Sequence, residues 1–432
     1  MSADVAIARR AFRQVRIGAV VWAVVFGATV ATTALAYVSS FPDQASRDQL
    51  AASTSGDAGA SILLGPISAI DTVGGYTVYK CYVFLTVIGA IWGLVIATRL
   101  LRGEEDTGRW QLALSGGTRA SRATAATLAA LATAVAVVFA GATLLTLLAG
   151  RDPDVGFGAG ASIVYGASLA IAPAFFVAVG ALASQLGRSR RLATGLGMGV
   201  FGVAFVLRMI ADSGPGTKWL LWVTPFGWIE RMRPFTDTNL LPLVLAAASV
   251  AALVAGTTLL AARRDAGAGV LASRDVVRPR PFGLGSPLGL AARIELPVLG
   301  AWCAGAVATG LSMGIVAKVA TGDVPTSIRN TIDRFGVEGS FSFVKQFLGV
   351  AFLFIATVVA LLPASQIGAA AEEETSGRLV HVLAQPTRRT VLLGGRLVLS
   401  AAGIVAAGLL AGLACWSGAA SQGVDPGFGT MA

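Results

Sequence analysis

Charged residues are scarce in this chain, and their scarcity excludes an ordinary soluble domain. Only 13% of the 432 residues are Asp, Glu, Lys or Arg, whereas 55% are hydrophobic. Soluble domains carry about 25% charged residues. The composition therefore predicts a protein whose main solvent is lipid.

Histidine and cysteine are almost absent, which removes most metal chemistry. The single histidine, His381, cannot build a His-based site, and the three cysteines show no metal-binding spacing. The chain also lacks a GxxxxGK[ST] phosphate loop. We expect no metal, no cofactor and no catalytic residue in this chain, so it is not predicted to be an enzyme.

Long apolar runs are what the sequence has in abundance. Windows of about 20 mainly apolar residues can cross a ~30 Å hydrocarbon layer, and they do so as helices. The predicted fold class is therefore all-α, a polytopic transmembrane helical protein of the cell membrane. The nine predicted spans lie near residues 17–38, 78–101, 123–149, 157–182, 192–211, 239–262, 296–317, 347–370 and 391–416.

The basic residues gather on one side of these spans. The net charge is +10, and arginine clusters such as 9–16 and 188–191 fall in segments on that side. Cytoplasmic loops of membrane proteins carry an excess of Lys and Arg, so we expect a cytoplasmic N-terminus. Because the arginines are spread over separate short loops, they form no single stripe, and no nucleic-acid partner is expected.

One charged loop occurs twice. Residues 104–122 and 373–391 align without a gap at an offset of 269 residues, each between two predicted spans on the cytoplasmic side. The identical pairs are Glu104/Glu373, Glu105/Glu374, Gly108/Gly377, Arg109/Arg378, Leu114/Leu383, Thr118/Thr387 and Arg119/Arg388.

This duplication predicts the domain organisation. Residues 1–265 are expected to form a first six-span repeat with an amphipathic helix at its N-terminus. Residues 266–285 form a polar cytoplasmic linker, and residues 286–432 begin a second repeat that is incomplete after about three spans. An even number of spans separates the two copies, so the two six-helix repeats are predicted to be parallel.

The duplicated loops are the candidate site for mechanical work. Acids in the first turn of a short helix are favoured by its dipole, and the following arginine can pair with them or with an acid on a neighbouring protein. A soluble partner that docks on such a loop can move the two spans on either side of it. The simpler interpretation is a solvated loop that obeys the positive-inside rule. The presence of a second copy with seven identical residues argues against this simpler interpretation.

Two other features of the spans remain open in the sequence. Arg208 and Asp212 stand one helical turn apart near the outer boundary, where they form either a structural salt bridge or part of a gate. The aromatic segment 219–235 is either a half-inserted outer helix or an ordinary aromatic belt. Aromatic span residues that either line a substrate path or simply pack are Trp22, Phe26, Trp92, Phe201 and Trp302.

The chain resembles the membrane subunits of type-2 ATP-binding-cassette (ABC) exporters, in particular the two-repeat actinobacterial permeases of the tetronasin or multidrug type. Four strings carry the resemblance: RLLRGEEDTGRW at 99–110, AEEETSGRL at 371–379, TPFGWIERMRPF at 224–235 and SPLGLAAR at 286–293.

This resemblance implies a permease that exports hydrophobic or amphipathic compounds, such as antibiotics. It implies two copies of a separate ABC ATPase subunit as partners, with ATP and Mg²⁺ bound on those subunits. The two loops would then be coupling helices that rest on the ATPases. The residues to which it assigns this role are Glu104, Glu105, Gly108, Arg109, Glu373, Glu374, Gly377 and Arg378.

Three other functions are alternatives, and one of them is a non-transporting assembly or signalling protein driven by an ATPase. An ion-gradient-driven multidrug carrier usually places acids at mid-membrane, and the predicted spans are nearly free of Asp and Glu. A membrane-embedded lipid-modifying enzyme needs a cluster of acid, base or metal-binding residues at one interface, and the sequence shows none.

Overall fold

The described part of the chain is all-helical. The computed structural model describes residues 3–54, 65, 67–212, 215–265, 269–271, 285–316, 356, 359, 362, 363, 366, 374, 384, 389–421 and 423. Within these residues, eight helices are long and apolar enough to cross a membrane. The prediction of an all-α polytopic membrane protein is therefore confirmed.

The eight long helices correspond to eight of the predicted spans, and α1 and α12 extend well before their predicted starts. They are α1 (Ala3–Ser40), α4 (Val73–Thr98), α7 (Ala120–Ala149), α8 (Ala159–Leu186), α9 (Arg190–Asp212), α11 (Leu241–Arg263), α12 (Pro287–Val316) and α17 (Arg389–Ser421). The remaining predicted span, 347–370, lies largely outside the described residues. The amphipathic segment 3–16 is not a separate element, because it runs without a break into the first span as α1.

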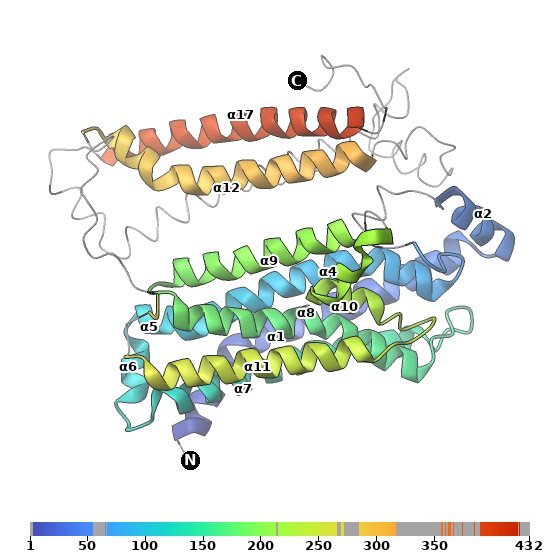
Figure 1. The fold of residues 1–432 in the computed structure, drawn as a ribbon, viewed down its shortest axis with the longest axis horizontal. Coiled ribbons are helices and arrows are strands. Elements are labelled where there is room, and N and C mark those ends of the chain that lie inside the picture. Colours follow the sequence, from blue (N-terminus) through green and yellow to red (C-terminus); the bar gives the residue numbers. More distant parts are fainter. Residues whose placement is uncertain are drawn as a thin grey trace. The chain divides into compact units, whose positions relative to one another are not determined.

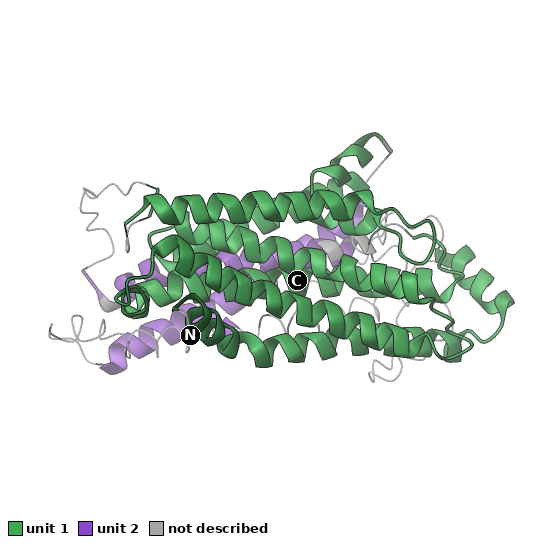
Figure 2. Cartoon of the chain, turned by 90° about the horizontal axis from the view of Figure 1, so that it is seen from below, with its two compact units in different colours: residues 1–274 green, residues 275–432 purple. Residues whose placement is uncertain are grey.

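The chain divides into two compact units, residues Met1–Arg274 and Asp275–Ala432, which Figure 2 shows in green and purple. The first unit also contains α2 (Gln44–Thr54) and several short elements between the spans. The second unit is described mainly by α12 and α17. The predicted domain boundaries at residues 265 and 286 stay a prediction.

Helix α8 lies at the centre of the first unit. It packs against α4, α7, α9 and α11, while α1 packs along α7 (Figure 1). In the most apolar window of each helix, 67% of α8 is buried but only 11% of α11. Helix α11 therefore lies at the edge of the bundle, where lipid covers its apolar side chains.

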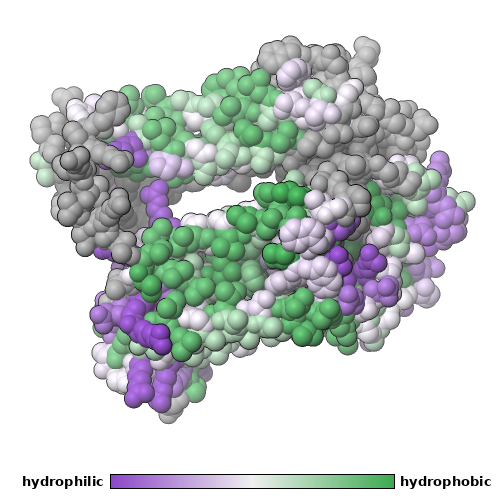
Figure 3. Space-filling model, in the orientation of Figure 1, coloured by the Kyte–Doolittle hydropathy of each residue, from purple (hydrophilic) through white to green (hydrophobic). Residues whose placement is uncertain are grey.

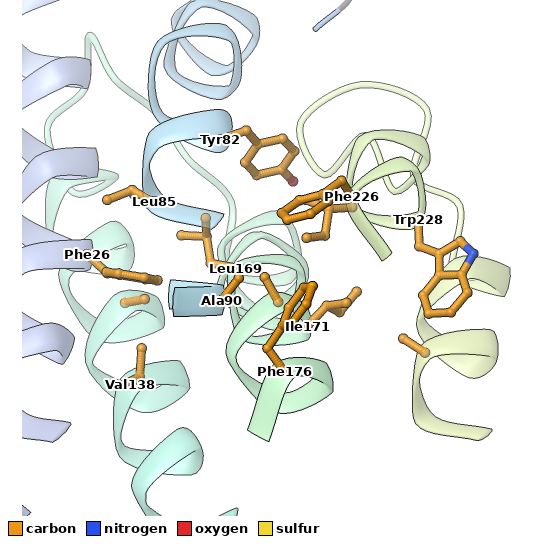
Figure 4. Packing of buried hydrophobic residues seen from close by; sticks show 14 of the residues in the cluster. Phe26, Tyr82, Leu85, Ala90, Val138, Leu169, Ile171, Phe176, Phe226 and Trp228 are labelled. Atoms are coloured by element: carbon orange, nitrogen blue, oxygen red, sulfur yellow. The ribbon is translucent and has the colours of Figure 1, made fainter. Parts of the chain in front are cut away.

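An aromatic core joins the helices of the first unit. Figure 4 shows Phe226 lying close to Tyr82 of α4 and Phe176 of α8. The centres of the Phe176 and Phe226 rings are 5.9 Å apart. Phe226 belongs to α10 (Pro225–Arg231), a short helix that is not a span. Its burial against mid-helix residues favours the half-inserted helix over an aromatic belt for this segment.

Small residues allow the closest helix contacts. In the second unit, Gly310 and Gly314 of α12 leave no room for a Cβ against the backbone of Ala411 and Cys415 of α17. A glycine at every fourth position lets two helices approach in lipid and gain packing contacts. In the first unit, Gly141 of α7 packs in the same way on α1.

The surface of each unit agrees with a lipid environment. Figure 3 shows apolar residues over the middle of the first unit and hydrophilic residues toward its two ends. Exposed side chains on its spans include Ile17, Val20, Phe84 and Val203. Exposed apolar side chains on this scale indicate a surface that something apolar covers.

Candidate functional site

The first of the two duplicated loops is fully described, and it continues the span α4 without a stop. A π-helical turn, η1 (Arg99–Gly103), follows α4 and leads into α5 (Glu104–Asp106). Gly108 then takes the left-handed conformation, with φ of +74°, and starts α6 (Arg109–Leu114). An L-residue is strained at such a φ, so glycine is needed for the chain to turn back toward α7.

Glu105 is buried, and its carboxylate is held between two arginines. Arg264, just past the end of α11, donates from Nη1 and Nη2 to the two carboxylate oxygens at 2.8 and 2.6 Å. Arg102 donates to Oε2 at 3.1 Å. The side chains of Glu105 and Arg102 are each only 2% exposed. The Glu105 carboxylate is therefore bonded within the protein and does not face a soluble partner.

The same arginines tie the loop to the turn between α8 and α9. Arg102 pairs with Asp106 at 3.1 Å and donates to the Arg188 carbonyl oxygen. Asp106 in turn accepts a hydrogen bond from the backbone N–H of Arg190 at 2.7 Å. We call Arg102, Glu105, Asp106 and Arg264 the loop clamp.

The loop clamp reaches a third helix through a glutamine. Gln185, near the end of α8, accepts a hydrogen bond from Arg264 Nε at 2.7 Å. The clamp thus connects α4, α8, α9 and α11 at one end of the bundle. Several charge-assisted bonds around one carboxylate make such a joint rigid.

The opposite face of the loop is exposed. The side chain of Arg109 is 55% exposed, and Leu112 is 74% exposed. Glu104 lies between the two faces, pairing with Arg10 of α1 at 2.9 Å and with Arg109 at 3.4 Å. Trp110 points inward and is buried among the helices. The loop therefore has one face fixed to the bundle and one face available for contact.

Of the four candidate coupling residues in the second copy of the loop, the structure describes Glu374. Glu373, Gly377 and Arg378 lie outside the described residues. The Glu374 carboxylate is 64% exposed and stands 3.8 Å from Arg389. An exposed pair at that distance adds little stability.

The two copies of the loop also differ in sequence at the clamp positions. At the offset of 269 residues, Ala371 stands where the first loop has Arg102, and Thr375 stands where it has Asp106. The second copy thus keeps the two glutamates but lacks two members of the clamp.

At the far end of the same helices, a second group of charges surrounds Arg208. Its Nε lies 3.1 Å from Asp212 Oδ2, and its Nη2 lies 3.3 Å from Glu230 Oε1. Lys218 is 3.8 Å from Asp212. We call Arg208, Asp212, Lys218 and Glu230 the distal cluster. The predicted Arg208–Asp212 pair is formed, but the sequence did not indicate that Glu230 of α10 shares the arginine.

Burial raises the pKa of Glu230 to about 7, and the neighbouring Asp212 charge adds to this while Arg208 opposes it. Two carboxylates that share one guanidinium in a buried place cannot both be fully compensated. The backbone of Gly65 lies over the Arg208–Glu230 pair, so closely that a Cβ there would collide with both side chains. The backbone of Gly65 thus covers the Arg208–Glu230 pair.

The five candidate path aromatics mostly take part in packing. Phe26 is 1% exposed, and Trp22, Trp92 and Phe201 pack against the same core. Trp302 is half-buried on α12. Their role in a substrate path stays a prediction, as does the coupling role of the eight loop residues.

Sequence reasoning missed Arg102, Arg264 and Gln185 as site residues. The spacing of Arg102 three and four residues before Glu105 and Asp106 was a usable signal. Nothing local marks Arg264, which is 159 residues from Glu105. Within the described ranges, no group of three His, Cys, Asp or Glu side chains comes together to hold a metal ion.

Comparison with known proteins gives one family for nearly the whole chain. Residues 5–263 and 284–432 match the family described as multidrug efflux system permease Rv1217c, C-terminal domain. The chain is also 32% identical over 407 residues to the multidrug efflux system permease protein Rv1217c of Mycobacterium tuberculosis (strain ATCC 25618 / H37Rv). The aligned region covers 93% of this chain and 72% of that relative.

Proposed function

Because the chain belongs to the Rv1217c family of multidrug efflux system permeases, we propose that this protein is the membrane subunit of an exporter driven by separate ATP-hydrolysing subunits. The cargo is a hydrophobic or amphipathic compound, antibiotics included. Two ABC ATPase subunits would bind ATP and Mg²⁺, and the loops at 104–122 and 373–391 would face them in the cytoplasm.

The two-faced loop between α4 and α7 is the observation that carries this proposal. A partner that pushes on the exposed Arg109 and Leu112 meets a loop whose other face is clamped by Arg102, Glu105 and Arg264. Because the clamp reaches α8, α9 and α11, the push moves several helices together instead of bending one turn. Arg109 is also a suitable partner for a carboxylate on an ATPase surface.

The buried clamp changes which substitution tests coupling. Reversing the charge of Glu105 would break the joint inside the permease, and lost transport would then report on folding. Leu112→Asp alters only the exposed face. Arg109→Glu also removes the exposed 3.4 Å pair with Glu104, but it leaves the clamp residues untouched, so both variants test docking.

We expect Arg109→Glu and Leu112→Asp each to reduce ATP-driven export from proteoliposomes at least about tenfold, because a reversed charge or a buried carboxylate at a docked contact costs more than 1.4 kcal/mol. The measurement is efflux of a fluorescent amphipathic dye by the permease reconstituted with the ATPase that co-purifies with it. Arg151→Glu is the matched control, since it makes the same charge change in the exposed turn at the other end of α7.

The thermal unfolding temperature of all three variants should equal that of the unchanged protein. Export at the original rate by both loop variants would refute docking at this face.

The distal cluster favours one second candidate, an ion-gradient-driven carrier. A buried carboxyl group such as Glu230, with its pKa near 7, can exchange a proton at physiological pH. That function predicts dye transport by the permease alone under an imposed pH gradient. The exporter we propose should be inactive in that assay until ATPase subunits and ATP are added.

A further inference from the structure

A cavity of about 220 Å³ lies beside the distal cluster, in the segment between α9 and α11. Three basic side chains line it: Lys218 of η2 (Pro215–Trp222), Arg231 at the end of α10, and Arg233 just after α10. Clefts that hold drug-sized ligands measure about 300–1,000 Å³. This cavity is smaller and suits a compact charged group.

Arg231 is held in place with one donor unused. Its guanidinium lies 4.4 Å from the centre of the Trp222 ring, and Nη2 donates to the Lys218 carbonyl oxygen at 3.4 Å. The Nε atom is buried and donates to no atom in the described part of the chain. A buried guanidinium donor without an acceptor is costly, so an anion that reached it would be stabilised.

Arg233 is held in an unusual backbone conformation. Its φ is +44°, which non-glycine residues rarely adopt. Such strain persists where the surrounding structure enforces it, and it is often found at ligand sites. Here the strained turn places Arg233 at the cavity, where the residue is exposed.

The acids in the wall leave the cavity with an excess of positive charge. Glu230 is already paired with Arg208 at 3.3 Å, and Asp237 is the other acidic residue in the lining. The raised pKa of Glu230, caused by burial, further reduces its negative charge near neutral pH. With the rest of the distal cluster counted, four cations (Arg208, Lys218, Arg231 and Arg233) stand beside three acids (Asp212, Glu230 and Asp237), so the net charge around the cavity is positive.

The position of the cavity along the spans identifies the level of the membrane that it faces. Helix α9 has 23 residues, which makes it about 34 Å long, close to the thickness of the hydrocarbon layer. The lining residues follow Asp212, the last residue of α9, and precede Leu241, the first residue of α11. One of them, Glu230, pairs with Arg208, one turn before the end of α9. The cavity is therefore at the depth of the lipid headgroups.

Exposed apolar residues neighbour the lining residues along the chain: Trp219 follows Lys218, Val223 comes two residues after Leu221, and Leu240 follows Asn239. Trp219 is 63% exposed, Val223 is 57% exposed and Leu240 is 52% exposed. Trp favours the boundary between headgroups and acyl chains. A basic hollow whose lining residues have exposed apolar neighbours matches a molecule that carries a phosphate next to a hydrocarbon chain.

We propose that this basic pocket, lined by Lys218, Arg231 and Arg233, binds the phosphodiester group of a membrane phospholipid. The arginines and the lysine donate to the phosphate oxygens, and Trp219 and Val223 lie against the acyl chains. The ligand stabilises the turn around α10 next to the distal cluster. This inference needs the chain to span a bilayer, but it does not depend on an ATPase partner.

Native mass spectrometry of the full-length protein in detergent, titrated with phosphatidylglycerol, tests the proposal. A basic side chain near a lipid phosphate adds about a factor of five in affinity. We expect Arg231→Gln and Arg233→Gln each to weaken the tightest-bound lipid about fivefold, and the double variant about 25-fold. The matched control Arg151→Gln, which removes one exposed arginine at the same end of the helices, should leave that affinity unchanged.

Three results would overturn the proposal. Equal lipid affinity of the unchanged protein and the double variant would remove the site, and an equal loss in Arg151→Gln would show only general attraction to basic charge. Displacement of the lipid by equimolar glycerol 3-phosphate would assign the pocket to a free phosphate compound. Should Arg231→Gln fail to fold, the exposed Arg233→Gln still decides the outcome.

Discussion

The loop clamp and the distal cluster lie at opposite ends of the same helices, and their buried charges are compensated in opposite ways. In the clamp, two arginines surround one carboxylate, and both oxygens of Glu105 accept bonds of 2.6–3.1 Å. In the distal cluster, two carboxylates share Arg208, and neither oxygen of Asp212 accepts a well-aligned hydrogen bond from the described residues.

This difference indicates two kinds of mechanical element. A carboxylate whose two oxygens together accept three charge-assisted hydrogen bonds is held in one arrangement, so the clamp keeps its end of the bundle rigid. A buried carboxylate that lacks full compensation can gain a proton or change its partner at modest cost. The distal end, where α10 is half-inserted, is therefore better suited to local change.

The largest predicted effect is on the free energy of unfolding, and it should distinguish the first loop from its duplicate. Glu105→Gln should lower the free energy of unfolding by about 3–5 kcal/mol, because it leaves two buried arginines without their shared charge. Glu374→Gln is the matched control, and the loss there should stay below about 1 kcal/mol because the Glu374–Arg389 pair is exposed. The measurement is thermal unfolding of the purified variants in detergent.

Similar unfolding temperatures for Glu105→Gln and Glu374→Gln would show that the clamp contributes no special rigidity. The contrast between the two loops would then be one of exposure alone.

A smaller effect is expected from the backbone of the same loop. Gly108→Ala should lower the free energy of unfolding by about 1–2 kcal/mol, because an L-residue is strained at the observed left-handed φ. Gly116→Ala in the same loop should be nearly neutral, since Gly116 has open space around its Cα and no positive φ. Equal unfolding temperatures for the two variants would mean that the loop relaxes freely and is not rigid.

The pH dependence of stability should come from the distal cluster. Burial raises the pKa of Glu230 from 4.5 to about 7, so between these values the folded protein binds a proton that the unfolded chain has released. The contribution of Glu230 to stability therefore falls as the pH rises through this range. Unfolding temperatures measured at several pH values should decline less steeply for Glu230→Gln than for the unchanged protein. Identical slopes would show that Glu230 is an ordinary ionised carboxylate.

Much of the architecture follows from local sequence alone. Eight of the predicted spans appear as long helices, because a helix in lipid must satisfy its own backbone and be about 20 residues long. Six of them lie within about five residues of the predicted ends, whereas α1 and α12 begin well before the predicted starts at residues 17 and 296. The Arg208–Asp212 pair was also predictable, since residues four apart meet on one helix face.

The candidate site was predicted less completely. Sequence similarity placed Glu104, Glu105 and Arg109 in one loop but could not separate the buried face from the exposed face. Glu105 points inward because Arg264 lies against it, and Arg264 belongs to the end of a different span. A contact between residues 159 positions apart leaves no periodic signal in a single sequence.

By itself, the sequence determined that this protein is an all-helical membrane protein with several spans and a duplicated acidic loop, because hydrophobic length and local spacing depend only on neighbouring residues. Its permease function was inferred from the resemblance to a known family. Only the tertiary structure decided that Glu105 is part of a rigid joint, that Glu230 shares Arg208, and that Arg231 and Arg233 line one basic cavity. These relationships arise when side chains from distant helices meet. In the apolar interior of the bundle, each buried charge must find its partner there or remain uncompensated.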